Sequence, residues 1–168
     1  TGKEPEKVVE PIIELKEDAY LDGEYINDAT NKIEIYQRIA AIRTDEHADQ
    51  LEEELIDRFG ALTEPVKKIM QVARLKNYAR KLKIKSIIEK PAFVEICFDK
   101  APNIETENVL LAKKQFDNLL KFVPKQNTIQ IKITPINKKH IINLCLKVVK
   151  VLTGEKLQKM TLKKEEKK

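Results

Sequence analysis

The chain has 168 residues, of which 42% are hydrophobic and 35% are charged, and its formal net charge is +5. This size suits one domain or two small lobes that share a core, and the even split between charges of both signs excludes a disordered chain. The apolar runs are far shorter than the roughly 18 residues of a membrane-spanning helix, and no signal-peptide pattern opens the sequence. We therefore expect a globular protein of the reducing cytoplasm that does not associate with membranes.

Charge is distributed unevenly along the sequence. Residues 1–64 hold 7 Lys and Arg against 18 Asp and Glu, a net charge of −11, whereas residues 65–168 hold 25 against 9, a net charge of +16. Such polarity favours an electrostatic contact with nucleic acid or with another charged domain. The alternative is that the two halves of the chain attract each other.

Residues with catalytic or metal-binding chemistry are sparse. The four glycines are too widely separated for a phosphate-binding loop, which needs them clustered. His47 and His140 have no second ligand at a suitable spacing, and Cys97 and Cys145 lie in separate apolar runs that are typical of small core residues. We therefore predict that this fragment has no catalytic residue, no metal site and no cofactor of its own.

The first predicted elements are a tail and a strand. Residues 1–7 are typical of a tail or linker, and residues 8–21 contain alternating apolar positions around Pro11. Because proline cannot donate to a central ladder, this strand should lie at the edge of a sheet or by itself. Asp22 and Gly23 predict a turn after it.

A first helix is predicted from residue 29 to residue 43, with Asp28 or Thr30 as its N-cap. Its helical period places four residues on the inner side: Ile35, Tyr36, Ile39 and Ile42.

Two further helices are predicted to follow. The second should begin after Thr44 as N-cap and end at Phe59, with acids in its first turn and Gly60 in the left-handed position beyond its end. The third should begin after Thr63 and extend to about residue 82, with a proline in its first turn, where the missing N–H is tolerated.

The pattern changes after the third helix. Two short β-branched and aromatic runs, at 84–90 and 92–98, predict a hairpin. Helical spacing returns over about 104–122, strict alternation predicts a strand at 127–134, and residues 136–152 again have the helical period.

These elements predict an α+β fold. Three helices, over about 26–83, precede a small, mostly antiparallel sheet made of the hairpin and one strand, with two packing helices, over about 84–153. We expect residues 8–153 to form a single domain and the lysine-rich residues 154–168 to form a flexible tail.

The second predicted helix carries an unusual density of acids. Its apolar stripe is Ala48, Leu51, Leu55 and Phe59, and the opposite side presents Glu46, Gln50, Glu53, Glu54 and Asp57, with Arg58 at one margin. Like charges at these spacings cost about 0.2–0.5 kcal/mol per pair, and no lysine of the helix compensates them. The stripe is either an ordinary solvated face or a docking surface.

The third predicted helix carries a sparse basic stripe. Lys67, Arg74 and Lys81 recur at sevenfold spacing and could contact phosphates, which would give salt-dependent binding without sequence preference. Solvated lysines explain the same pattern. A stand-alone basic nucleic-acid-binding module therefore remains the alternative function.

Three stretches of the sequence match one family in kind and order. They are IELKEDAYLDGEYI (13–26), KIEIYQRIA (32–40) and ELIDRFGALTEPVKKIMQVARLKNYARKLKIKSI (54–87). Together they resemble the C-terminal domain of the bacterial transcription-repair coupling factors, which carries a Glu-Leu-x-Asp-Arg-Phe-Gly block followed by a proline. The chain departs from the family at Asp22-Gly23 and at Thr63, where the family usually has proline, and these changes affect turns.

The resemblance implies a regulatory module of a larger protein. The family's full-length proteins are ATP-dependent double-stranded DNA translocases, holding ATP and Mg, that act on stalled RNA polymerase and recruit UvrA. In the family, the C-terminal domain docks on the N-terminal UvrB-like module and masks its UvrA-binding surface. The family's contact motif corresponds here to Glu54, Asp57 and Arg58. Glu46, Gln50 and Glu53 would form a secondary acidic face beside this motif. We assume that the chain is a monomer.

Overall fold

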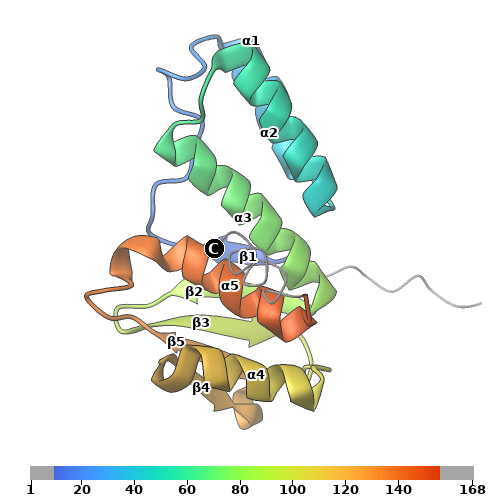
Figure 1. Ribbon diagram of the computed structural model, residues 1–168, viewed down its shortest axis with the longest axis vertical. Coiled ribbons are helices and arrows are strands. Elements are labelled where there is room, and N and C mark those ends of the chain that lie inside the picture. The colour runs from blue at the N-terminus through green and yellow to red at the C-terminus, as the bar shows by residue number, and fades with distance from the viewer. Residues whose placement is uncertain (1–9, 156–168) are drawn as a thin grey trace, which may run out of the picture.

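The computed structural model describes residues 10–155, which form a helical lobe and a sheet lobe (Figure 1). The elements in chain order are β1 (Ile12–Glu14), α1 (Ala29–Ala40), α2 (Asp45–Phe59), α3 (Glu64–Lys81), β2 (Ile84–Glu89), β3 (Phe93–Phe98), α4 (Thr106–Phe116), β4 (Leu120–Val123), β5 (Thr128–Lys132) and α5 (Ile141–Thr153). Helices α1, α2 and α3 make the helical lobe. The strands with α4 and α5 make the sheet lobe.

The sheet has five strands in the order β1-β2-β3-β5-β4. β1 pairs in parallel with β2, and all other neighbours are antiparallel. The predicted α+β class is confirmed, and β1 is the expected edge strand. The expected three-stranded sheet is wrong, because β1 joins the hairpin and because residues 120–122, assigned to the end of a helix, belong to β4.

Two clusters of buried side chains meet along α3. Val66 and Met70 in its first half pack with α1, α2 and the loop before α1. Leu75 and Tyr78 in its second half pack with α4, α5 and one face of the sheet. Figure 1 shows α3 running from the helical lobe down onto the sheet lobe, so this single helix joins the two cores.

Most predicted caps are confirmed. The Asp28 carboxylate accepts from the amide of Asn31 at 3.2 Å, and the Thr44 hydroxyl accepts from the amide of His47 at 3.1 Å. Thr63 stands at the N-cap position of α3, but its side chain does not cap the helix. Its hydroxyl donates instead to Asp22 at 2.6 Å, which ties α3 to the turn before α1.

Two helices of the sheet lobe are shorter than predicted. α4 ends at Phe116 because Asp117 has a positive φ of 40°, after which a 3₁₀ turn leads into β4. α5 begins at Ile141, preceded by a 3₁₀ turn at Lys138–His140. In both cases the helical spacing of apolar residues extends beyond the helix itself.

The predicted tails lie almost entirely outside the described residues. Gly154, assigned to the tail, is instead the left-handed C-cap of α5 with a φ of 83°. Glu155 accepts a hydrogen bond from the Tyr78 hydroxyl at 2.6 Å, so the end of α5 is fastened to α3. Burial, followed by the hydrogen bonds to Asp45 and Glu155, raises the pKa of Tyr78.

Candidate docking surface on the second helix

α2 lies on the outside of the helical lobe and packs through one apolar stripe. Ala48, Leu51 and Leu55 are buried against α1 and α3, as the helical period predicts. Asp45 and Glu46 stand in the first turn, where the helix dipole favours negative charge. The opposite side of the helix therefore faces solvent.

The solvent side carries a continuous stripe, which we call the outer stripe of α2: Glu46, Gln50, Glu53 and Asp57. These residues follow one another at four-, three- and four-residue steps, so they share one face of the helix. All four are exposed, and within residues 10–155 none of their side chains forms an ion pair or hydrogen bond. Three carboxylates thus remain without a cationic partner on one face.

Glu54 lies beside this stripe and is held by two arginines. Arg38 of α1 donates two hydrogen bonds to its carboxylate, the one from Nη2 at 2.9 Å, and Arg58 donates a third at 3.1 Å. These hydrogen bonds, first that of Arg38 and then that of Arg58, lower the pKa of Glu54. No lysine of α2 compensates Glu54, as expected, but Arg38 of a different helix and Arg58 of the same helix do.

Arg58 connects the same group to the end of α2. Its Nη1 lies 3.8 Å from Glu34 of α1, and its guanidinium stacks 4.9 Å from the centre of the Phe59 ring. The structure therefore brings Glu54 and Arg58 together as an i,i+4 pair within α2, and this pair is joined to α1 through Arg38 and Glu34. Asp57, the third residue of the contact motif, lies apart from them on the outer stripe.

The other acids of α2 are neutralised by Arg74 of α3. Its guanidinium lies 2.5 Å from Asp49, 3.4 Å from Glu52 and 3.5 Å from Asp45, and its side chain is 16% exposed. Arg74 is therefore occupied and is not available to a phosphate, contrary to the expected basic stripe. This pairing supports the alternative in which cations of the second half of the chain neutralise acids of the first.

The two lysines of the basic stripe are also engaged, although more loosely. Lys67 pairs with Glu64 at 3.1 Å, one turn earlier in α3, and Lys81 lies 3.5 Å from Glu155. Both side chains are more than half exposed, so solvent weakens these pairs. Because Arg74 is occupied by acids of α2, the residues of the α3 stripe that could still contact a phosphate are two lysines fourteen positions apart.

Tyr25 supports the end of α2. Its hydroxyl lies 3.0 Å from the carbonyl of Leu55 and 2.8 Å from that of Gly60, and its ring is 5.7 Å from that of Phe59. Gly60 has the expected positive φ, 89°, but its ψ of −169° is extended rather than left-handed helical. No helical period marks Tyr25, because it lies in a loop; its place in the 13–26 stretch is the one sequence signal.

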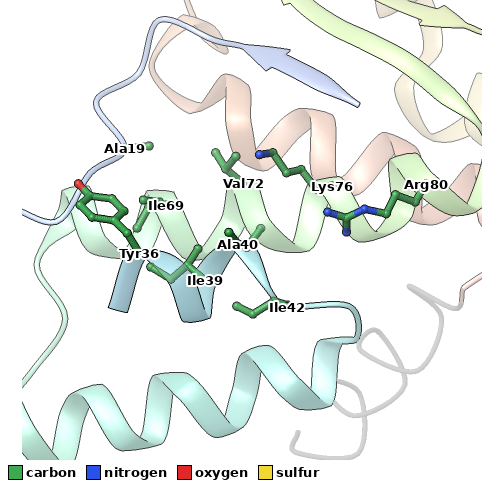
Figure 2. A pocket seen from close by; sticks show the side chains of 10 residues that line it. Ala19, Tyr36, Ile39, Ala40, Ile42, Ile69, Val72, Lys76 and Arg80 are labelled. Atoms are coloured by element: carbon green, nitrogen blue, oxygen red, sulfur yellow. The ribbon is translucent and has the colours of Figure 1, made fainter. Parts of the chain in front are cut away.

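A groove of about 280 Å³ separates α1 from α3 (Figure 2). Ile39 and Val72 contribute to its apolar wall, and Lys76 and Arg80 lie at the end away from Tyr36. Tyr36, predicted to face inward, is instead 39% exposed and accepts a hydrogen bond from the amide of Leu21 at 2.8 Å. Its hydroxyl needs a polar partner, which the loop before α1 supplies at the groove's rim.

Groups suited to catalysis are not gathered in the described part of the chain. No cluster of three or more His, Cys, Asp or Glu side chains within residues 10–155 has the geometry to hold a metal ion. His47 and His140 are exposed, and burial raises the pKa of the Cys145 thiol to about 12. None of the five helices in that range is long and apolar enough to cross a bilayer.

Comparison with known proteins gives a consistent family. The TRCF domain model matches residues 15–109. The transcription-repair-coupling factor of Escherichia coli K12 is 35% identical over 75 residues, which are 45% of this chain and 6% of that protein. The transcription-repair-coupling factor of Bacillus subtilis 168 is 32% identical over 98 residues, which are 58% of this chain and 8% of that protein. The transcription-repair-coupling factor of Borreliella burgdorferi is 28% identical over 152 residues, which are 90% of this chain and 14% of that protein.

A solved structure extends the match to the fold. The crystal structure of the C-terminal domain of a transcription-repair coupling factor superposes with a TM-score of 0.73 at 28% identity, covering 89% of this chain and 96% of that one. The chain spans 6–14% of the length of the three full-length relatives above. Sequence family and fold therefore agree, and the chain belongs to the TRCF domain family as a C-terminal domain of the transcription-repair coupling factor type.

Proposed function

We propose that this domain is a non-catalytic regulatory domain that docks through the outer stripe of α2 on the N-terminal UvrB-like module of its parent protein. Docking masks the UvrA-binding surface of that module and restrains the ATP-dependent DNA translocase. UvrA, RNA polymerase and double-stranded DNA are then indirect partners, reached through the whole cytoplasmic protein, which holds ATP and Mg outside this fragment.

The observation that carries the proposal is selective neutralisation of the α2 acids. Arginines of α1 and α3 neutralise Asp45, Asp49, Glu52 and Glu54. The three carboxylates of the outer stripe have no such partner within residues 10–155. Mutual repulsion of these carboxylates is relieved when a basic surface covers them, which favours a cationic partner.

An exposed charged contact also suits a restraint that must be released. Rim charges contribute mainly to association rate and specificity, and salt screens them over about 8 Å at physiological ionic strength. Ile56, which is 48% exposed and follows Glu53 by three residues, adds an apolar side chain at the margin of the stripe. Glu54 then acts as a positioning residue, because it fixes Arg38 and Arg58 at the edge of the stripe.

The test is a binding titration of the 168-residue chain against the separately expressed N-terminal module, at about 0.05 M and 0.5 M NaCl. The variant is Glu53→Lys/Asp57→Lys, which reverses two outer-stripe charges and breaks no contact within the domain. We expect affinity to fall by at least about tenfold at low salt, because like-charge juxtaposition costs several kcal/mol. High salt should weaken the native complex and narrow this difference.

A charge-matched control separates docking from net charge. Asp99→Lys/Glu105→Lys makes the same charge change at two exposed acids of the sheet lobe and should leave affinity unchanged. Glu54→Gln should weaken binding less than the outer-stripe variant. Equal loss in the control, or full binding by the outer-stripe variant, would overturn the assignment of this surface.

A further inference from the structure

The outer face of the sheet, opposite α4 and α5, contains a hollow of about 300 Å³. Side chains alternate between the two faces of each strand, so the residues between the buried core positions point to this outer face. The hollow lies where β3, β5 and β4 run side by side. Six of its lining residues are Phe93, Asn118, Leu119, Lys121, Gln130 and Lys132.

The strand register brings these side chains together. Phe93 of β3 is directly opposite Lys132 of β5, and Gln130 of β5 is directly opposite Lys121 of β4. Directly paired residues on one face have Cβ atoms roughly 4.5–5.5 Å apart. One half-buried aromatic ring therefore lies beside one exposed lysine, and one half-buried amide side chain lies beside the other.

The surrounding lobe carries an excess of unpaired cations. Residues 84–153 contain twelve lysines against six acidic residues, a net charge of +6. None of these lysines forms an ion pair within residues 10–155, whereas Arg38, Arg58, Arg74 and Arg80 of the helical lobe all do. An uncompensated basic surface of this kind favours a polyanionic ligand.

We propose that the hollow binds a single-stranded segment of nucleic acid. Lys121 and Lys132 contact successive phosphates, Phe93 offers a face for a base to stack on, and the amides of Gln130 and Asn118 can meet base edges. Aromatic rings on an open sheet flanked by basic side chains are how many sheet proteins bind unpaired bases, which a duplex would keep stacked inside.

Glu95 limits how far the strand can extend across the sheet. It is paired with Gln130 and Ile88 in the register, so its carboxylate shares the outer face and repels phosphate on the β2 side. The ligand path therefore runs from Phe93 at the start of β3 across Lys132 of β5 to Lys121 of β4, with Glu95 at its border. Removal of this carboxylate should strengthen binding, whereas removal of the lysines or of Phe93 should weaken it.

The experiment is fluorescence anisotropy with the 168-residue chain and a labelled single-stranded oligothymidine of about 15 nucleotides, near the site size of compact sheet domains. Lys121→Gln/Lys132→Gln should lower the slope of log K against log salt by about 1.4, since each single-strand phosphate contact contributes about 0.7. Phe93→Leu keeps the apolar bulk and should weaken binding by at least about fivefold. Glu95→Gln should raise affinity.

The matched control is Lys100→Gln/Lys125→Gln, two exposed unpaired lysines at the opposite end of the strands. It should leave the salt slope within about 0.3 of the native value. The proposal is overturned by absence of single-strand binding at low salt, by equal affinity for a duplex or a polyglutamate peptide, or by an equal effect of the control. The α2 variants should bind the oligonucleotide normally, so this test and the docking test fail independently.

Discussion

Replacement of Arg74 by methionine should destabilise the domain, because Arg74 neutralises three acids of α2 at once. Methionine preserves most of the apolar stem but leaves Asp45, Asp49 and Glu52 facing one another without a cation. The buried Oδ1 of Asp45, which accepts no hydrogen bond within residues 10–155, would lose the guanidinium that lies 3.5 Å away. The two helices would then repel along the part of their interface that the arginine now joins.

The magnitude lies between two limits. Breaking a fully buried ion pair costs about 3–5 kcal/mol, whereas a surface pair contributes about 0.2–1 kcal/mol. Arg74 is 16% exposed, but Asp49 is 62% exposed and Asp45 is 36% exposed, so solvent screens much of the interaction. We therefore expect a loss of about 2 kcal/mol, which lowers the melting temperature by about 4–8 °C for a chain of this size.

Urea unfolding followed by circular dichroism at pH 7 measures this loss. Lys67→Met is the control, because Lys67 is a cation of the same helix and its side chain pairs, within residues 10–155, only with the exposed Glu64. It should cost less than about 0.5 kcal/mol. Added salt should reduce the difference in the free energy of unfolding between the native and Arg74→Met proteins, since salt screens the repulsion among the three unpaired carboxylates. A loss below about 0.5 kcal/mol for Arg74→Met would refute the reasoning.

Three further predictions concern separate parts of the chain. Gly60→Ala should cost about 1–3 kcal/mol in urea unfolding, because its φ of 89° disfavours any Cβ although no atom lies within 4 Å of one; an unchanged midpoint would contradict this. Since Arg38 lowers the folded-state pKa of Glu54, the stability that Glu54 contributes is complete above the ordinary carboxyl range and disappears as the pH falls through the lowered pKa. Native and Glu54→Gln proteins should therefore differ in urea midpoint at pH 6 and converge in acid, and a constant gap would argue against the linkage. Iodoacetamide at pH 8 should label Cys97 and spare Cys145, whose thiol is buried with a pKa of about 12; comparable labelling by mass spectrometry would show that the core opens.

Local signals predicted the helical lobe well. The limits of α2 follow from Thr44 and the Phe59-Gly60 stop, both of which act through neighbouring backbone groups. β4 was missed because it is four residues long and depends on pairing with β5, which no local pattern records. Apolar spacing alone could not separate it from the preceding helix.

The candidate docking surface was predicted in part. Helical spacing placed Asp57 and Glu53 on an exposed face, which the structure confirms. The pairing of Glu54 with Arg38 and of Arg74 with Asp49 could not be predicted, because each of these ion pairs joins two helices whose relative rotation is set by packing. Ion pairs between different helices depend on the tertiary structure. In the structure they neutralise some acids of α2 and leave those of the outer stripe without a cationic partner within residues 10–155.

The sharing of α3 between both cores has a consequence for how the domain unfolds. If either lobe opens, the half of α3 that it held frays, and the other lobe loses the continuity of the same helix. We therefore expect one cooperative melting transition, with hydrogen-exchange protection highest near the middle of α3. A ligand bound to either lobe would raise the hydrogen-exchange protection of this shared segment. Binding at one lobe would therefore make the other lobe more rigid.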